Sequence, residues 1–360
     1  MKHKSPLPVA IATLLIAALF VALSGGAVVR FGGADTTPRE RSFAFTYEVH
    51  VPADAAAQGQ QGQVRLWIPL PQSDEHQTVH KLSLDSPVAY RKGTDSEYAN
   101  NYAVFAPTPE QTAAGYDVTL KFEVSRREYA RNVAALQKVT AHADPHASGA
   151  SKVMLQRYLQ PDKLVPLNAT IAELAKEQTA GATTPVEKAH RIYNYVATTM
   201  KYDKSGEGWG RGDAMWACDS KRGNCTDFHS VLIGMLRSSG IPARFEIGFP
   251  LPEGKSEGDI PGYHCWAEFY LDGTGWVPVD ASEASKNPAK RDYFFGTVDA
   301  DRVRFTYGRD IRLSSEQKGD PLNYFIYPYA ESNGQTVKGL KTHFAFRDLT
   351  PQAASAGGGH

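Results

Sequence analysis

The stretch that decides the fold reads Gly223-Asn224-Cys225-Thr226-Asp227-Phe228-His229-Ser230. An apolar run follows as far as residue 236, and Gly240-Ile241-Pro242 comes directly after it. Asn224 is a good N-cap, and Asp227 stands where a capping box places its acidic residue. Glycine and proline just beyond a helix prevent it from continuing. The pattern therefore predicts a helix with a buried face and with Cys225 in its first turn.

Three strands are predicted after this helix, over residues 243–250, 263–271 and 276–280. Residues 272–275 read Asp-Gly-Thr-Gly, which is a hairpin signal between the second and third strands. The second strand carries His264 near its start, and the third ends at Asp280. Antiparallel neighbours bring cross-strand side chains together, so we expect His264 and Asp280 to meet.

Cys225, His264 and Asp280 form a chemically complete set. A thiol at a helix N-terminus feels the positive end of the helix dipole, which favours the reactive thiolate. Imidazole suits proton transfer near neutral pH, and a carboxylate orients the ring and stabilises the imidazolium. The order predicts a nucleophile, a base and an orienting group, with the backbone N–H of Cys225 as an oxyanion donor.

Helices and a loop are predicted before this stretch. Asn168 is the expected N-cap of a helix over residues 168–176. Thr184-Pro185-Val186-Glu187 is a strong start signal for a second helix, with a cap, a proline at the first position and a capping-box glutamate. Residues 202–212 form a glycine-rich loop. Further strands are expected over residues 302–307 and 323–329.

The N-terminal half reads as a different domain. Alternating patterns predict strands over residues 43–51, 64–71, 78–84, 102–105 and 116–124. We interpret residues 41–130 as a β-rich, small β-sandwich-like domain that precedes a catalytic domain over residues 150–330. The small residues of 350–360 are typical of a disordered tail.

The first 29 residues are typical of a targeting segment. Lys2 and Lys4 precede an apolar run over residues 9–29, which indicates a signal peptide or a membrane anchor. We therefore expect export to a periplasmic or other extracytoplasmic place, with the protein either secreted or anchored in the inner membrane. The formal net charge of +0 gives no sign of a nucleic-acid partner. Three cysteines are too few for a disulfide scaffold.

The motifs around Cys225, His264 and Asp280, together with the Gly-Ile-Pro-Ala-Arg segment at 240–244, resemble the core of the transglutaminase-like superfamily. That superfamily contains transglutaminases, peptide N-glycanases and bacterial proteins related to cysteine proteases. The resemblance covers roughly residues 165–285. It implies an α+β, papain-like fold, in which the cysteine-bearing helix packs on an antiparallel sheet, and it implies these three residues as the triad.

Together with the N-terminal segment, the resemblance predicts an exported thiol enzyme that hydrolyses or transfers peptide or protein amide bonds through an acyl-thioester. An acidic calcium loop is not evident in the sequence, which argues against calcium-dependent crosslinking, and we predict neither a cofactor nor a metal. The oligomeric state is open. The alternative function is a non-catalytic module that binds peptides or envelope partners.

Several other residues near the predicted triad could have either a functional or a purely structural role. Trp216, Tyr263 and Trp266 are candidates for substrate binding, although each suits a core or cleft wall. His229 shares a helix face with Cys225 and is an alternative base. Cys265 should face away from His264, because strand neighbours alternate, and a disulfide with Cys218 would leave Cys225 free. A zinc site made from these cysteines and histidines is a further alternative.

Overall fold

The computed structural model describes residues 38–53, 63–133 and 152–349. The chain divides into two units, Met1–Gly32 and Gly33–His360, and the described residues belong to the second. The expected signal peptide or anchor over residues 1–29 and the expected tail over 350–360 lie outside the described residues. Within the described ranges, no helix has both the length and the apolar character needed to cross a membrane.

Helix α7 (Cys225–Ser238) confirms the prediction made from its flanking residues. The Asn224 side chain accepts a hydrogen bond from the N–H of Thr226 at 3.0 Å, and the Asp227 carboxylate accepts one from the N–H of Asn224 at 2.9 Å. Gly223 has φ +146°, and a Cβ there would lie 2.3 Å from Asp227 Oδ2. Only glycine fits this approach. Every residue from Cys225 to Arg237 is buried, so α7 is a central helix.

An antiparallel sheet of order β13-β12-β10-β15 packs beside α7. Its strands are β10 (Ala243–Pro250), β12 (His264–Leu271), β13 (Gly275–Val279) and β15 (Arg302–Tyr307). All eight residues of β12 are buried, which means that both faces of the sheet are covered. The hairpin between β12 and β13 turns at residues 272–274, as the sequence predicts.

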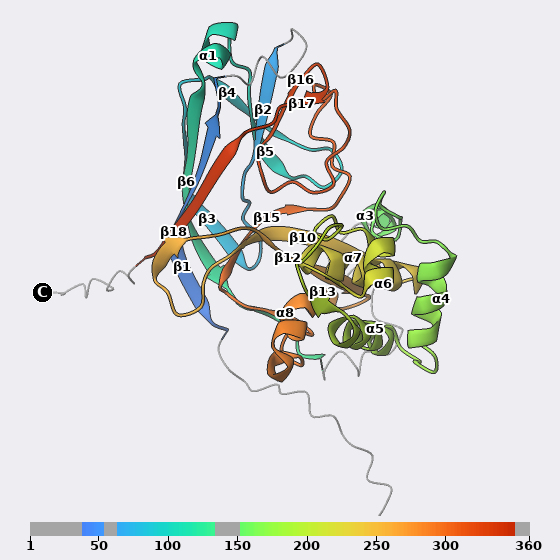
Figure 1. Cartoon of the computed structure of the whole chain (residues 1–360). Coiled ribbons are helices and arrows are strands. Elements are labelled where there is room, and N and C mark those ends of the chain that lie inside the picture. Colours follow the sequence, from blue (N-terminus) through green and yellow to red (C-terminus); the bar gives the residue numbers. More distant parts are fainter. Residues whose placement is uncertain (1–37, 54–62, 134–151, 350–360) are drawn as a thin grey trace, which may run out of the picture. The chain divides into compact units, whose positions relative to one another are not determined.

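Four helices pack around α7 (Figure 1). They are α4 (Ala169–Gln178), α5 (Pro185–Thr199), α6 (Ala214–Ser220) and α8 (Ala281–Lys286). The expected caps are present, since Asn168 accepts from Ile171 N–H and Thr184 forms a capping box with Glu187. Shorter elements complete this half of the chain: α3 (Lys152–Arg157), η1 (Pro288–Lys290), and the paired strands β8 (Lys201–Tyr202) and β9 (Arg222–Gly223).

Two five-stranded sheets are built mainly from the N-terminal half. One has the order β11-β18-β1-β6-β3, with β1 (Glu40–Val51), β3 (Gln77–Asp85), β6 (Tyr116–Arg127), β11 (Glu257–Asp259) and β18 (Lys341–Asp348). The other has the order β17-β16-β2-β5-β4, with β2 (Val64–Pro69), β4 (Tyr90–Thr94), β5 (Asn101–Phe105), β16 (Tyr329–Ser332) and β17 (Gln335–Thr336). Helix α1 (Pro109–Ala114) and the pair β7 (Tyr129–Ala130) and β14 (Thr297–Val298) complete the elements.

C-terminal strands complete both of these sheets. β18 pairs with β1, with Phe43 opposite Asp348, and β16 pairs with β2. The expected strand over residues 323–329 is wrong, because β16 begins only at Tyr329, after Pro328 has interrupted the run. The domain boundaries at 41–130 and 150–330 stay a prediction. The fold class is confirmed as α+β, with an N-terminal β-sheet region before helices packed on an antiparallel sheet.

Aromatic side chains join the sheet that contains β1 to the β13-β12-β10-β15 sheet, which we call the catalytic sheet because it carries His264. The Phe45 ring on β1 lies 5.4 Å from the ring of Phe249 on β10 and 5.9 Å from that of Phe305 on β15. All three side chains are essentially unexposed. Burying aromatic side chains of this size contributes strongly to stability. The N-terminal region therefore supports the sheet that carries His264.

Candidate active site

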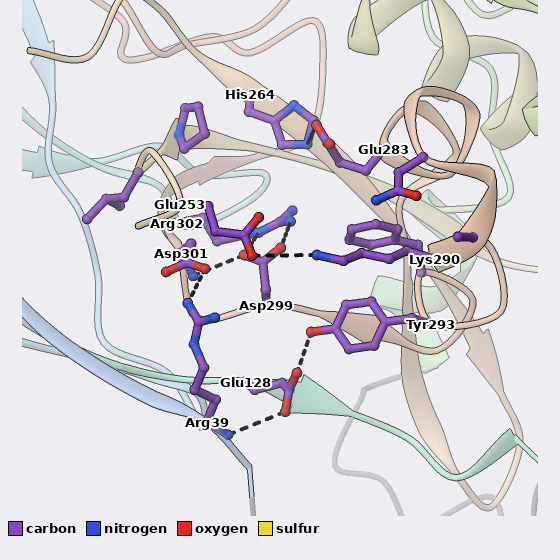
Figure 2. A pocket seen from close by; sticks show the side chains of 15 residues that line it. Arg39, Glu128, Glu253, His264, Glu283, Lys290, Tyr293, Asp299, Asp301 and Arg302 are labelled. Carbon is purple, nitrogen blue, oxygen red and sulfur yellow. Dashed lines mark hydrogen bonds and ion pairs between the residues drawn. The ribbon is translucent and has the colours of Figure 1, made fainter. Parts of the chain in front are cut away.

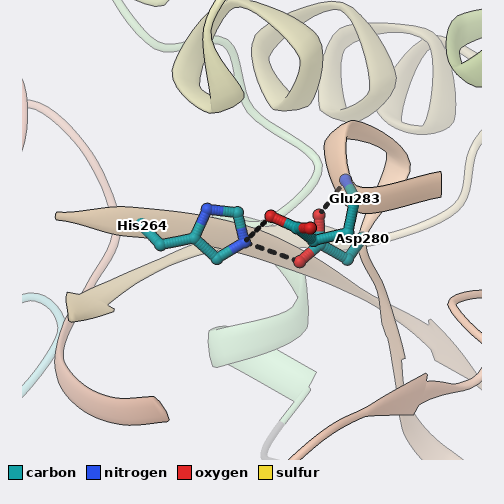
Figure 3. A group of neighbouring side chains, drawn as sticks. All are labelled: His264, Asp280 and Glu283. Carbon is teal, nitrogen blue, oxygen red and sulfur yellow. Dashed lines mark hydrogen bonds and ion pairs between the residues drawn. The ribbon is translucent and has the colours of Figure 1, made fainter. Parts of the chain in front are cut away.

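His264 and Asp280 meet at the end of the catalytic sheet (Figure 3). His264 is the first residue of β12, and its Nε2 donates to Asp280 Oδ2 at 2.7 Å. Asp280 follows β13 and caps α8. The strand register places Ala267 opposite Val279, so Asp280 is not directly opposite His264. The two side chains reach each other along the strands, and the expected meeting is present.

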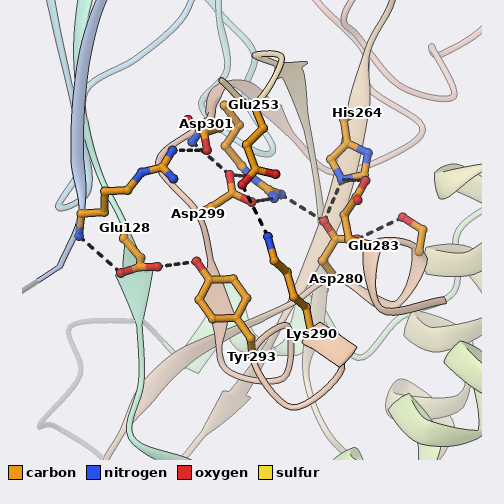
Figure 4. Close-up of polar contacts among 12 residues, drawn as sticks. Glu128, Glu253, His264, Asp280, Glu283, Lys290, Tyr293, Asp299 and Asp301 are labelled. Atoms are coloured by element: carbon orange, nitrogen blue, oxygen red, sulfur yellow. Dashed lines mark hydrogen bonds and ion pairs between the residues drawn. The ribbon is translucent and has the colours of Figure 1, made fainter. Parts of the chain in front are cut away.

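Arg302 also binds the Asp280 carboxylate. Figure 4 shows the polar contacts around Asp280 and Asp299. Arg302 Nη1 donates to Asp280 Oδ2 at 3.1 Å, while its Nε and Nη2 bind Asp299 at 3.1 and 2.8 Å. Burial raises the pKa of Asp280, but His264 and Arg302 outweigh it and hold that pKa well below its usual range. Asp280 is therefore an ionised, fully buried anchor for the imidazole. No pattern in the sequence indicated Arg302 as part of this site.

The Cys225 thiol completes the chain of contacts. It lies in the first turn of α7 with 2% of the residue exposed, and its thiol is near enough to the side chains of His264 and Cys265 for both to shift its pKa. Since Asp280 occupies Nε2 of His264, Nδ1 is the nitrogen left for the thiol. Burial opposes ionisation, but the side chains of Cys265 and His264 hold the pKa of Cys225 well below its ordinary value.

The same contacts raise the pKa of His264 to about 10, although burial alone lowers it. Asp280 is the largest favourable cause, and Cys225 adds to it. A thiol with a lowered pKa beside an imidazole with a raised pKa forms a thiolate–imidazolium pair near neutral pH. The structure thus brings together the three residues predicted from the sequence, in an arrangement suited to nucleophilic attack.

Cys265 occupies an unexpected place. Cys265 and His264 point to opposite faces of β12, as expected. However, α7 packs on the face that carries Cys265, so the Cys265 thiol lies next to Cys225 and belongs to the site. Cys218 is half-buried on α6, in a groove shared with α4. All three cysteines are free, and the expected disulfide between Cys218 and Cys265 is not formed. The distant position of Cys218 also separates it from the other proposed zinc ligands.

His229 is not placed as the base. Its Nδ1 is 2.8 Å from the carbonyl oxygen of Cys225, and its Nε2 accepts from the N–H of Ala281 at 3.2 Å. A carbonyl can only accept and an amide N–H can only donate, so these partners require the neutral tautomer with its proton on Nδ1. Burial lowers the pKa of His229, which agrees with a neutral ring. The residue ties α7 to the start of α8.

The aromatic candidates occupy three different environments. Tyr263 accepts from Asn224 Nδ2 at 3.0 Å, and its ring lies 5.6 Å from that of Tyr324 and 5.8 Å from that of Tyr327. These three tyrosines make a wall beside Cys225, and sequence reasoning missed the last two. Trp266 is unexposed and donates to Glu246 Oε2 at 2.8 Å, a position that does not fit the expected substrate contact.

Trp216 packs against the glycine-rich loop that precedes α6. A Cβ at Gly208 would lie 2.4 Å from its indole nitrogen, and the Arg222 guanidinium carbon lies 5.4 Å from the centre of its ring. The loop itself is pinned to α7, because the Asp227 carboxylate accepts from the N–H groups of Gly210 and Gly212 at 2.7 and 2.9 Å. A substrate-binding role for Trp216 stays a prediction.

A charged pocket of about 540 Å³ opens beside His264 (Figure 2). Its lining comes from β10 and the loop after it, from α8 to residue 294, and from residues 299–302. Pro250, Leu251 and Glu253 of the 250–262 loop line it, whereas residues 257–259 of the same loop form β11. Carboxylates outnumber cations in this lining: Glu128, Glu253, Glu283, Asp299 and Asp301 against Arg39, Lys290 and Arg302.

One group of side chains has the geometry of a cation site. The ligand atoms of His264, Asp280 and Glu283 lie within 4.8 Å of one another. Arg302 already binds Asp280, and Lys286 forms an ion pair with Glu283. These two cations neutralise much of the negative charge that would attract a metal. The arrangement fits a histidine held by carboxylates better than it fits a metal centre.

The sequence of this chain is similar to those of several known proteins. Residues 172–281 match the core of the transglutaminase-like superfamily. An uncharacterized protein of Haemophilus influenzae is 30% identical over 328 residues, which are 82% of this chain and 86% of that protein. The uncharacterized protein YebA of Bacillus subtilis is 35% identical over 81 residues, which are 20% of this chain and 11% of YebA.

A solved structure shares the fold over most of its length. It is described as a "putative cysteine protease" from Cytophaga hutchinsonii, and it superposes with a TM-score of 0.59 at 14% identity. The match covers 88% of this chain and 93% of that one. At this identity the likeness concerns the fold alone. It confirms the expected core, in which helices pack on an antiparallel sheet.

Proposed function

This chain belongs to the transglutaminase-like superfamily, and from that premise we propose that it is a thiol enzyme acting on peptide or protein amide bonds. The observation that supports the proposal is the grouping of three side chains, in which His264 lowers the pKa of the Cys225 thiol and binds Asp280 at 2.7 Å. The thiol lies at the capped N-terminus of α7, and the imidazole is hydrogen-bonded to the buried Asp280 carboxylate. Nucleophilic catalysis by cysteine needs these two features.

In the proposed reaction, the Cys225 thiolate attacks the amide carbonyl carbon, and the carbonyl oxygen becomes an oxyanion. The N–H of Cys225 lies at the first position of α7, where helix geometry leaves it without an intrahelical partner. It is therefore the natural donor to that oxyanion. The His264 imidazolium then gives its proton to the departing amine, and an acyl-thioester forms on Cys225.

The second half of the reaction returns the thiol to its starting state. Neutral His264 takes a proton from water or from an acceptor amine, and that nucleophile attacks the thioester carbonyl. Water gives hydrolysis, whereas an amine gives acyl transfer. Asp280 stabilises the imidazolium that is present before the first half and forms again in the second, and Arg302 keeps Asp280 ionised.

We also propose that the enzyme acts outside the cytoplasm. The basic and apolar residues of 1–29 support this proposal. An epitope placed at the C-terminus should be accessible to added protease in cells whose outer envelope is opened and whose inner membrane is intact. N-terminal sequencing of the recovered protein separates a cleaved signal peptide from a retained anchor. Recovery of the full chain in the cytoplasm alone would contradict export.

A covalent probe tests the activity directly. The full chain is incubated with peptide-amide libraries and with an electrophilic peptide probe, and the adduct is located by mass spectrometry. We expect the adduct on Cys225, and we expect Cys225→Ala to lose turnover with its thermal unfolding midpoint preserved. Cys218→Ala is the matched control and should keep full turnover. Unchanged turnover in Cys225→Ala would refute the assignment, and peptide binding without any adduct would support the non-catalytic alternative.

A further inference from the structure

A second cavity, of about 520 Å³, lies within the described part of the chain and does not include the triad. It is bordered by residues 74–76, by β6 and β7, and by the catalytic sheet. Glu246 on β10 and Glu268 on β12 line it. Glu268 points to the opposite face of β12 from Cys265, because strand neighbours alternate. The cavity therefore lies on the sheet face turned away from α7.

Most of the buried charges around this cavity are paired. Arg304 donates to Asp74 Oδ2 through Nε at 3.0 Å and Nη2 at 2.7 Å. Arg244 donates to Glu268 Oε2 through Nε at 2.6 Å, and the same nitrogen lies 3.4 Å from Glu246 Oε1. The half-buried Asp74 and the buried Glu246 and Glu268 thus each have an arginine beside them, although Glu246 Oε1 accepts no hydrogen bond from the described residues. Glu75, the remaining acidic side chain of the lining, is 81% exposed.

Two arginines that line the cavity, Arg126 and Arg131, have no carboxylate partner among the described residues. Arg126 is 3% exposed, its Nη1 makes one long hydrogen bond of 3.4 Å to Gln77, and its Nε has no partner among the described residues. Arg131 gives its Nε to the Tyr129 hydroxyl and to the carbonyl of Trp276, each at 3.2 Å. Neither guanidinium forms an ion pair with any carboxylate in the described ranges.

A buried guanidinium without an anion is costly. Removing one ion from water costs several kcal/mol unless a counter-charge or a full set of hydrogen bonds compensates it. The planar fork of arginine matches the paired oxygens of carboxylates and phosphates. His76 adds to the lining with an unpartnered Nδ1, and its ring stacks on Tyr129 with 3.7 Å between ring centres. The wall thus offers spare guanidinium N–H groups of Arg126 beside a flat aromatic surface.

We propose that this cavity binds the oxyanion group of a small organic ligand, a carboxylate or a phosphate, through Arg126 and Arg131. The volume is within the usual range of small-molecule sites, roughly 300–1,000 Å³. The site is separate from Cys225 and does not depend on the proposed catalysis. The ligand would rest against Trp276 and the Arg244–Glu268 pair, on the reverse face of the strands that carry the catalytic residues.

Isothermal titration calorimetry on the full chain tests the proposal, with sodium acetate and sodium phosphate as probes and sodium chloride holding the ionic strength constant. We expect saturable binding of at least one probe. Arg126→Gln should weaken it about tenfold or more, which is the usual worth of a charge-assisted hydrogen bond. Lys121→Gln is the matched control, because it removes an exposed positive charge from the same strand and should leave Kd unchanged.

The two probes distinguish the sources of the oxyanion. Binding of acetate alone assigns a carboxylate ligand, and binding of phosphate alone assigns a phosphate-bearing one. If Arg126→Gln does not fold, Arg131→Gln decides, since its side chain is only half-buried and should weaken binding severalfold. The absence of saturable heat with both probes, or equal Kd values in wild type and the arginine variants, would overturn the proposal.

Discussion

Replacing Asp280 by asparagine separates the charge of this side chain from its shape. Asp280 Oδ2 accepts from His264 Nε2 at 2.7 Å inside a fully buried site. A hydrogen bond to a charged group contributes about 1.5–3 kcal/mol, which corresponds to about 1–2 pKa units. In Asp280→Asn the pKa of His264, about 10 in the wild type, should therefore fall by about 1–2 units. The pKa of Cys225 should rise, because a less basic imidazole stabilises the thiolate less.

The assay is alkylation by iodoacetamide over the pH range in which cysteine and histidine titrate. After quenching and digestion, mass spectrometry reports the labelled fraction of each cysteine peptide. The acid limb of the Cys225 profile should move up by about 1–2 pH units in Asp280→Asn. In the same digests Cys218 should label mainly at alkaline pH, since burial raises its pKa.

Asp272→Asn is the control for this experiment, because it removes an exposed carboxylate from the turn of the adjoining hairpin. Its Cys225 profile should coincide with that of the wild type. An acid limb that does not move in Asp280→Asn would refute the reasoning, since the His264–Asp280 contact would then have no part in stabilising the thiolate. Equal and slow labelling of all three cysteines in the wild type would refute an activated Cys225.

Three further variants test other contacts. Arg302→Gln should lower the free energy of unfolding in urea by about 3–5 kcal/mol near neutral pH. Because the pKa of Asp280 is lower in the folded than in the unfolded chain, ionised Asp280 stabilises the fold at pH values above its unfolded pKa. The cost should therefore shrink as the pH falls and Asp280 takes up a proton. Gly248→Ala should cost at least about 1–3 kcal/mol, because the new Cβ would lie 1.8 Å from the carbonyl oxygen of Val303. Asn224→Ala should cost about 1 kcal/mol and slow the alkylation of Cys225, since the helix cap and the bond to Tyr263 are lost.

The glycine variant and the asparagine variant each have a matched control, and the pH dependence serves as the internal check for Arg302→Gln. Gly262→Ala should be nearly neutral, because its Cβ would meet only the Tyr327 hydroxyl, at 3.6 Å. Thr184→Ala removes a cap of similar strength from α5 and should leave the alkylation rate of Cys225 unchanged. A pH-independent cost in Arg302→Gln, or similar costs for the two glycine variants, would contradict these explanations. So would an alkylation rate in Asn224→Ala equal to that of the wild type.

Local signals account for what the sequence could predict. The caps at Asn224 and Thr184 and the turn at residues 272–275 act within a few residues, so they fix α7, α5 and the β12–β13 hairpin without knowledge of the rest. The positions of Cys225, His264 and Asp280 then follow, because each stands at an end of one of these elements.

Contacts between distant segments account for what the sequence could not predict. Arg302 is one of many arginines, and no pattern marks it as the one that lies beside Asp280. Tyr324 and Tyr327 reach Tyr263 through a segment that was interpreted as a strand. The alternation along β12 was predicted correctly, but the face on which α7 packs was not known, so the contact of Cys265 with Cys225 was missed.

The pairing of β1 with β18 has a consequence for biosynthesis. Phe43 of β1 pairs with Asp348 of β18, which the ribosome adds about 300 residues later. At about 5–20 residues per second, this interval is roughly 15–60 s. Until then the outer hydrogen-bonding groups of β1 are unsatisfied, as in any open sheet edge. If the chain is exported as proposed, such a delay is useful, because early tertiary structure obstructs translocation. We expect a nascent chain that stops before residue 341 to stay protease-sensitive and to depend on chaperones, with or without the Cys225 thiol.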